Sequence, residues 1–155
     1  NQNVMKNLLT TLFLLGVLTC GAQHSAGTSS DEEAIRKVIQ TSYVEGLQNE
    51  GDTVKINSGF HPSFEMLIPA KDGSLQKYGL AAWKAKIREN VADGRLPRKK
   101  GEEISVKFLE VDVTGTAATA KFEFYVGGKL TFVDYMFLYR FSDGWKIVSK
   151  IYYKF

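Results

Sequence analysis

The chain has 155 residues, of which 44% are hydrophobic and 24% are charged, and its formal net charge is +3 at pH 7. This balance predicts one globular domain with a sizeable core and excludes a fibrous or disordered chain. The net charge is too small for a typical nucleic-acid-binding protein, so we expect no nucleic-acid partner.

The first 22 residues have the pattern of a secretory signal peptide. Lys6 supplies the positive end, an apolar stretch runs from residue 8 to residue 18, and small side chains follow up to Ala22. The apolar stretch is far shorter than the roughly 20 residues that a membrane-spanning helix needs. We therefore expect an exported protein that is periplasmic, secreted or held at the cell envelope by a lipid.

Cys20 is the only cysteine, and two cleavage sites remain open around it. Cleavage after Thr19 makes Cys20 the lipid-bearing first residue of a lipoprotein, whereas cleavage after Ala22 leaves Gln23 as the first residue of a soluble protein. In the lipoprotein, the lipid is the only expected contact with a membrane. In both cases the domain itself has no cysteine, which excludes a disulfide and thiol chemistry within it.

Residues 23–29 are rich in Ser, Gly, Ala and Thr, which is typical of a flexible tether. The folded domain is expected to span residues 30–155. Ser30 and Glu33 have the spacing of a capping box, which predicts that the first helix begins at Ser30. Apolar side chains then recur at helical spacing, and Gly51 is expected to end the helix.

The next segment is predicted to contain two helices and a hairpin. Residues 52–59 favour a short helix, residues 64–70 an extended strand, and residues 72–73 a tight hairpin turn. A further helix, with Trp83 on its apolar side, is predicted between residues 79 and 94.

Four basic side chains gather in the loop after this helix: Arg95, Arg98, Lys99 and Lys100. Glu102 and Glu103 follow them at once. A solvated loop explains the cluster, and a patch for an anionic partner is the alternative.

Four strands of about eleven residues each are predicted to end the chain, over residues 103–113, 116–126, 129–141 and 145–154. Short turns that contain glycine separate them, so we expect an antiparallel meander. Strands of this length coil strongly. Helices packed on one face then give an α+β fold, in which a curved antiparallel β-sheet wraps around the N-terminal helices.

The turn at residues 127–128 sets the expected register of the two strands beside it. A two-residue loop places Phe122 opposite Val133 and Ala120 opposite Tyr135, which makes one apolar face for the helices.

The opposite face of the sheet combines charged and apolar side chains. On it this register places Lys121 opposite Asp134. A three-residue turn at Asp143-Gly144 would place Asp134 opposite Tyr152, with Lys150 one diagonal step away. Such a face is too apolar to be left in water and too charged for an ordinary core. We expect it to be either a dimer surface or the wall of a cavity.

The candidate ligand-pocket residues are ionisable or aromatic side chains in apolar surroundings: Tyr43, His61, Trp83, Asp134, Tyr135 and Lys150. A carboxylate among apolar walls can have a raised pKa and move protons next to a carbonyl, which makes Asp134 the one candidate catalytic residue. The alternative is structural. Lys121, Asp134 and Lys150 then form a cross-strand ion ladder, and Tyr43 and Trp83 belong to the core.

Metal and cofactor chemistry lack a sequence motif. His24 and His61 are the only histidines, and no glycine-rich loop precedes a helix. We therefore expect no metal and no cofactor.

Four motifs together resemble the "putative lumazine-binding" family of the nuclear transport factor 2-like superfamily. They are Tyr43-Val44-Glu45-Gly46, Phe60-His61-Pro62, Phe132-Val133-Asp134-Tyr135 and Gly144-Trp145-Lys146-Ile147-Val148-Ser149-Lys150-Ile151. The resemblance implies a cone-shaped fold with a cavity between sheet and helices, and a homodimer. Some relatives use this cavity for isomerase, cyclase or dehydratase chemistry, and others only for binding.

Three functional hypotheses follow. The leading one is a domain that binds a small hydrophobic or aromatic molecule in the cavity. The first alternative is an isomerase, dehydratase or cyclase with Asp134 as base. The second is a dimerising interaction module without a ligand, in which one strand face binds another subunit: Phe132, Met136, Leu138 and Val148.

Overall fold

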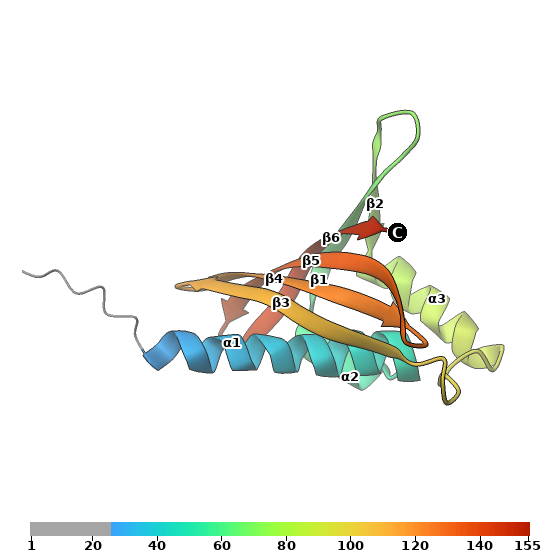
Figure 1. The fold of residues 1–155 in the computed structure, drawn as a ribbon, viewed down its shortest axis with the longest axis horizontal. Helices are drawn as coiled ribbons and strands as arrows, with labels where there is room; N and C mark the ends of the chain where they lie inside the picture. Colours follow the sequence, from blue (N-terminus) through green and yellow to red (C-terminus); the bar gives the residue numbers. More distant parts are fainter. Residues whose placement is uncertain (1–25) are drawn as a thin grey trace, which may run out of the picture.

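Figure 1 shows the fold of residues 26–155, the part of the chain that the computed structural model describes. Its elements are, in chain order, α1 (Ala26–Val38), η1 (Ile39–Glu50), α2 (Thr53–Gly59), β1 (Phe60–Pro69), β2 (Leu75–Gly79), α3 (Leu80–Ala92), β3 (Ile104–Thr114), β4 (Ala117–Val126), β5 (Lys129–Phe141) and β6 (Gly144–Lys154). The signal peptide, Cys20 and both cleavage sites lie outside the described residues and stay predictions. Within residues 26–155, no helix combines the length and the apolar composition that crossing a membrane requires.

The helix α1 and the π-helical stretch η1 form one continuous rod (Figure 1). The rod begins at Ala26, so the prediction of a start at Ser30 was wrong, and Ser30 lies inside α1. The predicted tether is likewise helical over residues 26–29. Gly51 ends the rod as predicted, with a left-handed backbone at φ 75°.

The buried side of the rod carries a regular apolar stripe. Ile35, Ile39, Tyr43 and Leu47 are each at most 1% exposed. They repeat every four residues, a spacing wider than the 3.6 residues of an α-helical turn. The looser winding of η1 keeps such a stripe on one side, so Tyr43 points into the core.

The segment between the rod and the long strands contains the predicted elements, but β1 begins at Phe60 and not at residue 64. Asp52 caps α2, because its side chain accepts hydrogen bonds from the backbone N–H groups of Val54 and Lys55. The hairpin of β1 and β2 is present, and α3 packs Trp83 against the core.

All six strands form one sheet in the order β2-β1-β6-β5-β4-β3. The strands β3 to β6 form the predicted antiparallel meander. The strand β1 adds to β6 in parallel, a pairing that the sequence patterns did not predict. The sheet is curved and unclosed, and the rod lies across its inner side (Figure 1). The predicted α+β fold is confirmed.

A β-bulge changes the predicted register of β4 and β5. The pairs next to the turn are as predicted, but Thr131 is then an extra residue in β5. Beyond it, Phe122 lies opposite Asp134 and not opposite Val133. One extra residue moves every later side chain of β5 to the other face of the sheet.

The bulge reverses the predicted faces of β5. Asp134 shares the inner face with Phe122 and is fully buried, whereas Tyr135 lies beside Lys121 on the outer face and is 37% exposed. The expected pairing of Lys121 with Asp134 is therefore wrong. The pairing of Asp134 with Tyr152 is confirmed, but the turn between β5 and β6 has two residues and not three, and a second bulge at Val148 restores the predicted register.

The predicted subunit-binding face is also wrong, because Met136 and Leu138 point to the helices and are 0% and 2% exposed. The exposed apolar side chains of the two strands lie instead on the outer face: Tyr135, Phe137, Tyr139, Ile151 and Tyr153. We refer to these five as the outer aromatic face.

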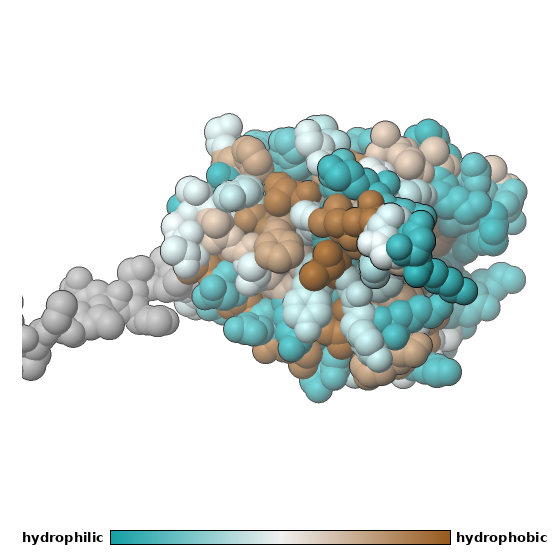
Figure 2. Space-filling view, turned by 90° about the horizontal axis from the view of Figure 1, so that it is seen from above, coloured by the Kyte–Doolittle hydropathy of each residue, from teal (hydrophilic) through white to brown (hydrophobic). Residues whose placement is uncertain are grey.

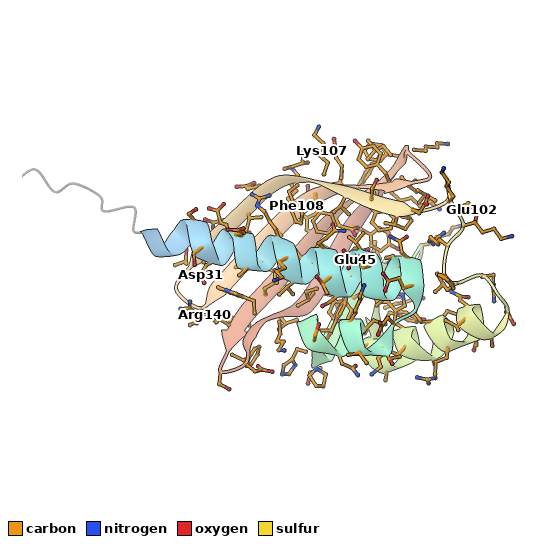
Figure 3. The ribbon with its side chains drawn as sticks, turned by 90° about the horizontal axis from the view of Figure 1, so that it is seen from below. Asp31, Glu45, Glu102, Lys107, Phe108 and Arg140 are labelled. Atoms are coloured by element: carbon orange, nitrogen blue, oxygen red, sulfur yellow. The ribbon has the colours of Figure 1, made fainter. Side chains whose placement is uncertain are left out.

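Asp31 attaches the beginning of the rod to the hairpin of β5 and β6. Its carboxylate accepts hydrogen bonds from Arg140, at 3.0 and 3.1 Å, and from the indole N–H of Trp145, at 3.1 Å. Figure 3 shows Asp31 on α1 next to Arg140. This attachment helps to set the angle of the rod, and thereby the place where Tyr43 meets the sheet.

Candidate functional site

Tyr43, Asp134 and Lys150 form a buried polar cluster between the rod and the sheet. The hydroxyl of Tyr43 donates to Oδ2 of Asp134 at 2.7 Å. The ammonium group of Lys150 donates to the Tyr43 hydroxyl at 2.7 Å and lies 2.8 Å from the same Oδ2. Asp134 is 0% and Lys150 5% exposed, so this ion pair is part of the core.

Burial shifts the pKa of all three groups in the direction that favours the uncharged form of each group. Burial raises the pKa of the Asp134 carboxyl, against the opposing effect of the Lys150 charge. Burial lowers the pKa of the Lys150 ammonium, against the opposing effect of Asp134. Burial, with the charge of Asp134 beside it, raises the pKa of Tyr43 well above its ordinary value. Their mutual contact, together with the hydrogen bond that Tyr43 donates to Asp134, favours the charged forms of the pair.

Aromatic rings surround the Lys150 ammonium. Its nitrogen lies 5.0 Å from the ring centre of Tyr43, 5.2 Å from Tyr152, 5.8 Å from Trp83 and 6.0 Å from Phe124. Cations within about 6 Å of a ring face gain roughly 0.5–2 kcal/mol per contact, more when water is excluded. These rings offset part of the desolvation cost of the buried charge.

A cavity of about 280 Å³ opens beside this ammonium group, and we call it the Lys150 cavity. Its lining comes from the rod, α3, the loop before β3 and the inner face of the sheet: Tyr43, Gln48, Met66, Trp83, Arg98, Ile104, Phe124, Val126, Phe132, Lys150 and Tyr152. Asp134 is not among these residues. It lies behind Tyr43 and Lys150 and reaches the cavity only through them.

The structure brings together four of the six predicted pocket residues. Tyr43, Trp83 and Lys150 line the cavity, and Asp134 lies behind it. Tyr135 is on the outer face because of the bulge in β5. His61 lines a different, more polar cleft of about 670 Å³ between α2, α3 and the hairpin of β5 and β6.

His61 has a local structural role in that cleft. Its ring stacks on Phe141 with the ring centres 4.9 Å apart, and its Nδ1 accepts a hydrogen bond from the backbone N–H of Ser63. The placement of His61 in the same pocket as Asp134 was therefore wrong, since β1 carries it to the other side of the core.

Arg98 and Gln48 line the cavity although neither was a predicted site residue. The solvated-loop interpretation holds for Arg95, Lys99 and Lys100, which are exposed, but Arg98 is half-buried. Its Nε donates to the carbonyl of Gln48 at 2.9 Å, which holds it against the end of the rod. The basic cluster was the only sequence signal that pointed to Arg98.

The cluster can bind and orient a polar group, but it offers no metal site. Lysine has three N–H donors, and Tyr43 and Asp134 accept two of those of Lys150. The third is available to a molecule in the cavity. Within residues 26–155, no group of three or more His, Cys, Asp or Glu side chains is placed to hold a metal ion.

The ion pair leads to a prediction about stability. Asp134→Asn and Lys150→Met should each lower the free energy of unfolding by about 3–5 kcal/mol, because each leaves a buried charge without its partner. The double variant should lose at least about 2 kcal/mol less than the sum of the single losses. Urea unfolding of all four proteins measures this coupling, and additivity within about 0.5 kcal/mol would contradict it.

The free energy of unfolding of these variants should also depend on pH in different ways. In Lys150→Met the buried Asp134 keeps its proton to a higher pH in the folded state than in the unfolded state. The folded state then binds more protons above about pH 4, so the free energy of unfolding should fall as pH rises from there. Asp134→Asn/Lys150→Met lacks the carboxyl and should not show this fall.

Known structures resemble the described domain at low sequence identity. A nuclear transport factor 2-like protein of unknown function from Shewanella baltica is 21% identical, with a TM-score of 0.63 over 82% of this chain and 95% of its own. A similar protein from Silicibacter pomeroyi is 20% identical, with a TM-score of 0.64 over 82% and 98%. A "putative dehydratase" of this fold from Streptomyces avermitilis is 20% identical, with a TM-score of 0.54 over 82% and 97%.

These likenesses establish the fold and no activity. No curated protein matches the chain. The "putative lumazine-binding" family matches residues 30–153. Because this match covers nearly all of the described domain, the chain belongs to the "putative lumazine-binding" family, and its fold is that of the nuclear transport factor 2-like structures.

Proposed function

We propose that this domain binds a small hydrophobic or aromatic molecule in the Lys150 cavity. The observation that supports the proposal most is the combination of aromatic walls with a few convergent polar groups, which is typical of ligand sites. Such sites usually measure about 300–1,000 Å³. A cavity of about 280 Å³ therefore suits a molecule of one or two rings.

The walls are held in place by contacts among the rings themselves. Tyr43 and Trp83 pack edge to face at 6.0 Å, and Phe132 packs edge to face with both Phe124 and Tyr152 at 5.5 Å. Rings fixed in this way lose little conformational freedom when a ligand binds. The arrangement supports binding by a pocket that exists before the ligand arrives.

The position of Asp134 favours binding over catalysis by this residue. A general base needs hydrogen-bond contact with the proton that it removes, directly or through one water. Oδ2 of Asp134 is occupied by Tyr43 and Lys150, and Oδ1 is buried with no partner within residues 26–155. Asp134 therefore serves in this proposal to position Lys150 and Tyr43. The description "putative dehydratase" belongs to the Streptomyces avermitilis protein and gives Asp134 no catalytic role.

Tryptophan fluorescence provides a direct test of the cavity. Trp83 lines it, and the only other tryptophan, Trp145, does not. Among lumazine, benzoate and benzyl alcohol, at least one should quench the emission in a saturable way and raise the melting temperature. A ligand at a hundred times its Kd should add about 2.7 kcal/mol of stability.

Two variants serve as controls for this experiment. Trp83→Phe should abolish the quenching but keep part of the thermal stabilisation, because a ring remains in the wall. Leu75→Ala, on exposed β2, should change neither signal. If no probe at millimolar concentration alters emission or melting temperature, the binding proposal is refuted.

A second candidate function is association of two copies through the outer aromatic face. Figure 2, which views the side opposite α1, shows apolar side chains gathered in the middle of this surface with polar ones around them. Beside the aromatic ridge of β5, two shallow hollows of about 230 and 200 Å³ lie over small residues of β4 such as Ala117 and Thr119. A ridge next to hollows on one patch suits a second copy, because a two-fold interface must be complementary to itself.

This candidate predicts a dimer in sedimentation equilibrium at micromolar concentration. Phe137→Glu places a charge in the middle of the patch and should give a monomer with an unchanged circular dichroism spectrum. Val54→Glu changes an exposed apolar residue of α2, away from this face, and should leave the dimer intact. A wild-type protein that is monomeric at several hundred micromolar would rule out the interface.

Export is proposed on residues 1–22 alone. The amino-terminal residue of the protein recovered from cell fractions distinguishes the routes: a lipid-bearing Cys20 indicates a lipoprotein, and Gln23 indicates a soluble exported protein. Recovery of an uncleaved chain from the cytoplasm would contradict both.

A further inference from the structure

We infer that the ligand of the Lys150 cavity carries a single carboxylate, which Lys150 and Arg98 hold, on a small aromatic or apolar body. This inference rests on the proposed binding function and adds the charge of the ligand. The starting observation is the charge of the lining. It includes two cationic side chains, and no aspartate or glutamate of residues 26–155 is part of it.

Arg98 provides the uncompensated charge. Its backbone N–H donates to the carbonyl of Asn49 at 2.8 Å and its Nε to that of Gln48 at 2.9 Å, which holds the side chain at the cavity. Both acceptors are neutral, and Arg98 forms no salt bridge with any carboxylate of the described residues. Its two terminal amino groups therefore remain for a ligand, and they match the two oxygens of a carboxylate.

Lys150 provides the second contact at the inner end. Its charge is balanced in part by Asp134, but one of its three N–H donors is unused within the described chain. A carboxylate that accepts this donor completes the hydrogen bonding of a buried ammonium group. One unused donor and one guanidinium suit one carboxylate better than a group of higher charge.

A second cavity of about 240 Å³ shares Gln48, Trp83 and Arg98 with the first. It adds Lys86 and Arg95 to the lining and again contains no carboxylate of residues 26–155. Both added cations are already paired, Lys86 with Glu89 and Arg95 with Asp93. Arg98 is therefore the cation of this lining that has no salt-bridge partner within residues 26–155.

The apolar walls exclude an ion without an apolar body. Phe124, Phe132 and Trp83 contribute rings that a small inorganic anion would leave uncovered. Single-ring aromatic carboxylates combine both requirements in a volume that the cavity can hold. The aromatic ring then packs among the walls, and the carboxylate lies between Lys150 and Arg98.

Matched pairs of probes that differ only in charge test this inference. Benzoate against benzamide, and 1-naphthoate against 1-naphthamide, are titrated into the full domain, with calorimetry and Trp83 emission as readouts. We expect each carboxylate to bind at least about tenfold more tightly than its amide. The preference should decrease as salt concentration rises, because the guanidinium is partly exposed.

Variants assign the preference to its residues. Arg98→Gln should weaken carboxylate binding about tenfold and leave amide binding within about twofold. Lys99→Gln removes an exposed charge from the same loop, does not line the cavity, and should change neither affinity by more than about twofold. Lys150→Met should abolish the preference, and its melting curve shows whether it has folded. If Lys150→Met does not fold, Arg98→Gln still tests the inference.

The outcomes separate this inference from the proposed function. Equal affinity for carboxylate and amide overturns the inference and leaves binding in the cavity intact. A carboxylate preference that Arg98→Gln does not reduce also overturns it, since the charge would then be recognised elsewhere. Failure of all four probes to bind, together with failure of lumazine and benzyl alcohol in the fluorescence test, refutes the binding function itself.

Discussion

The ion pair of Asp134 and Lys150, capped by the Tyr43 hydroxyl, is the interaction on which the inner side of this domain depends. Two charges within 2.8 Å and almost without exposure tolerate burial only while each has the other. The hydrogen bonds of the Tyr43 hydroxyl to both groups set the distance between the rod and the two central strands. They also fix the direction of the Lys150 ammonium, which points toward the aromatic cavity, and leave Asp134 behind it.

A buried ion pair is an expensive way to stabilise a core, because well-packed apolar side chains often serve as well or better. In this domain the pair lies next to a hollow that the surrounding rings do not fill. The rings lower the cost of the charge, and the charge gives the otherwise apolar hollow a polar end. The same contacts that hold the fold together therefore also prepare a place where a small molecule can be oriented. That coincidence connects the stability of the core with the proposed binding function.

Much of the architecture follows from local patterns along the chain. The apolar stripe from Ile35 to Leu47, the stop at Gly51, the cap at Asp52 and the glycine-containing turns between the strands all act over a few residues, so their effect can be predicted without knowing the fold. The resemblance of four motifs to a known family then predicted that these elements form a cone-shaped fold. The diagonal neighbours Asp134 and Lys150 were predicted on a three-residue turn between β5 and β6, whereas the structure has a two-residue turn and a bulge at Val148 that together give the same pairing.

The sequence by itself thus determined most of the elements and their order. Only the tertiary structure decided the register that brings Asp134 close to Lys150, and the faces of the sheet on which the side chains lie. The extra residue at Thr131 carries no distinctive local signal, yet it turns Asp134 inward and Tyr135 outward. The separation of His61 from the cluster and the arrival of Arg98 depend on how β1 and the loop after α3 pack against distant elements. Such placements arise from contacts between residues far apart in the chain, which the spacing of residues along it does not encode.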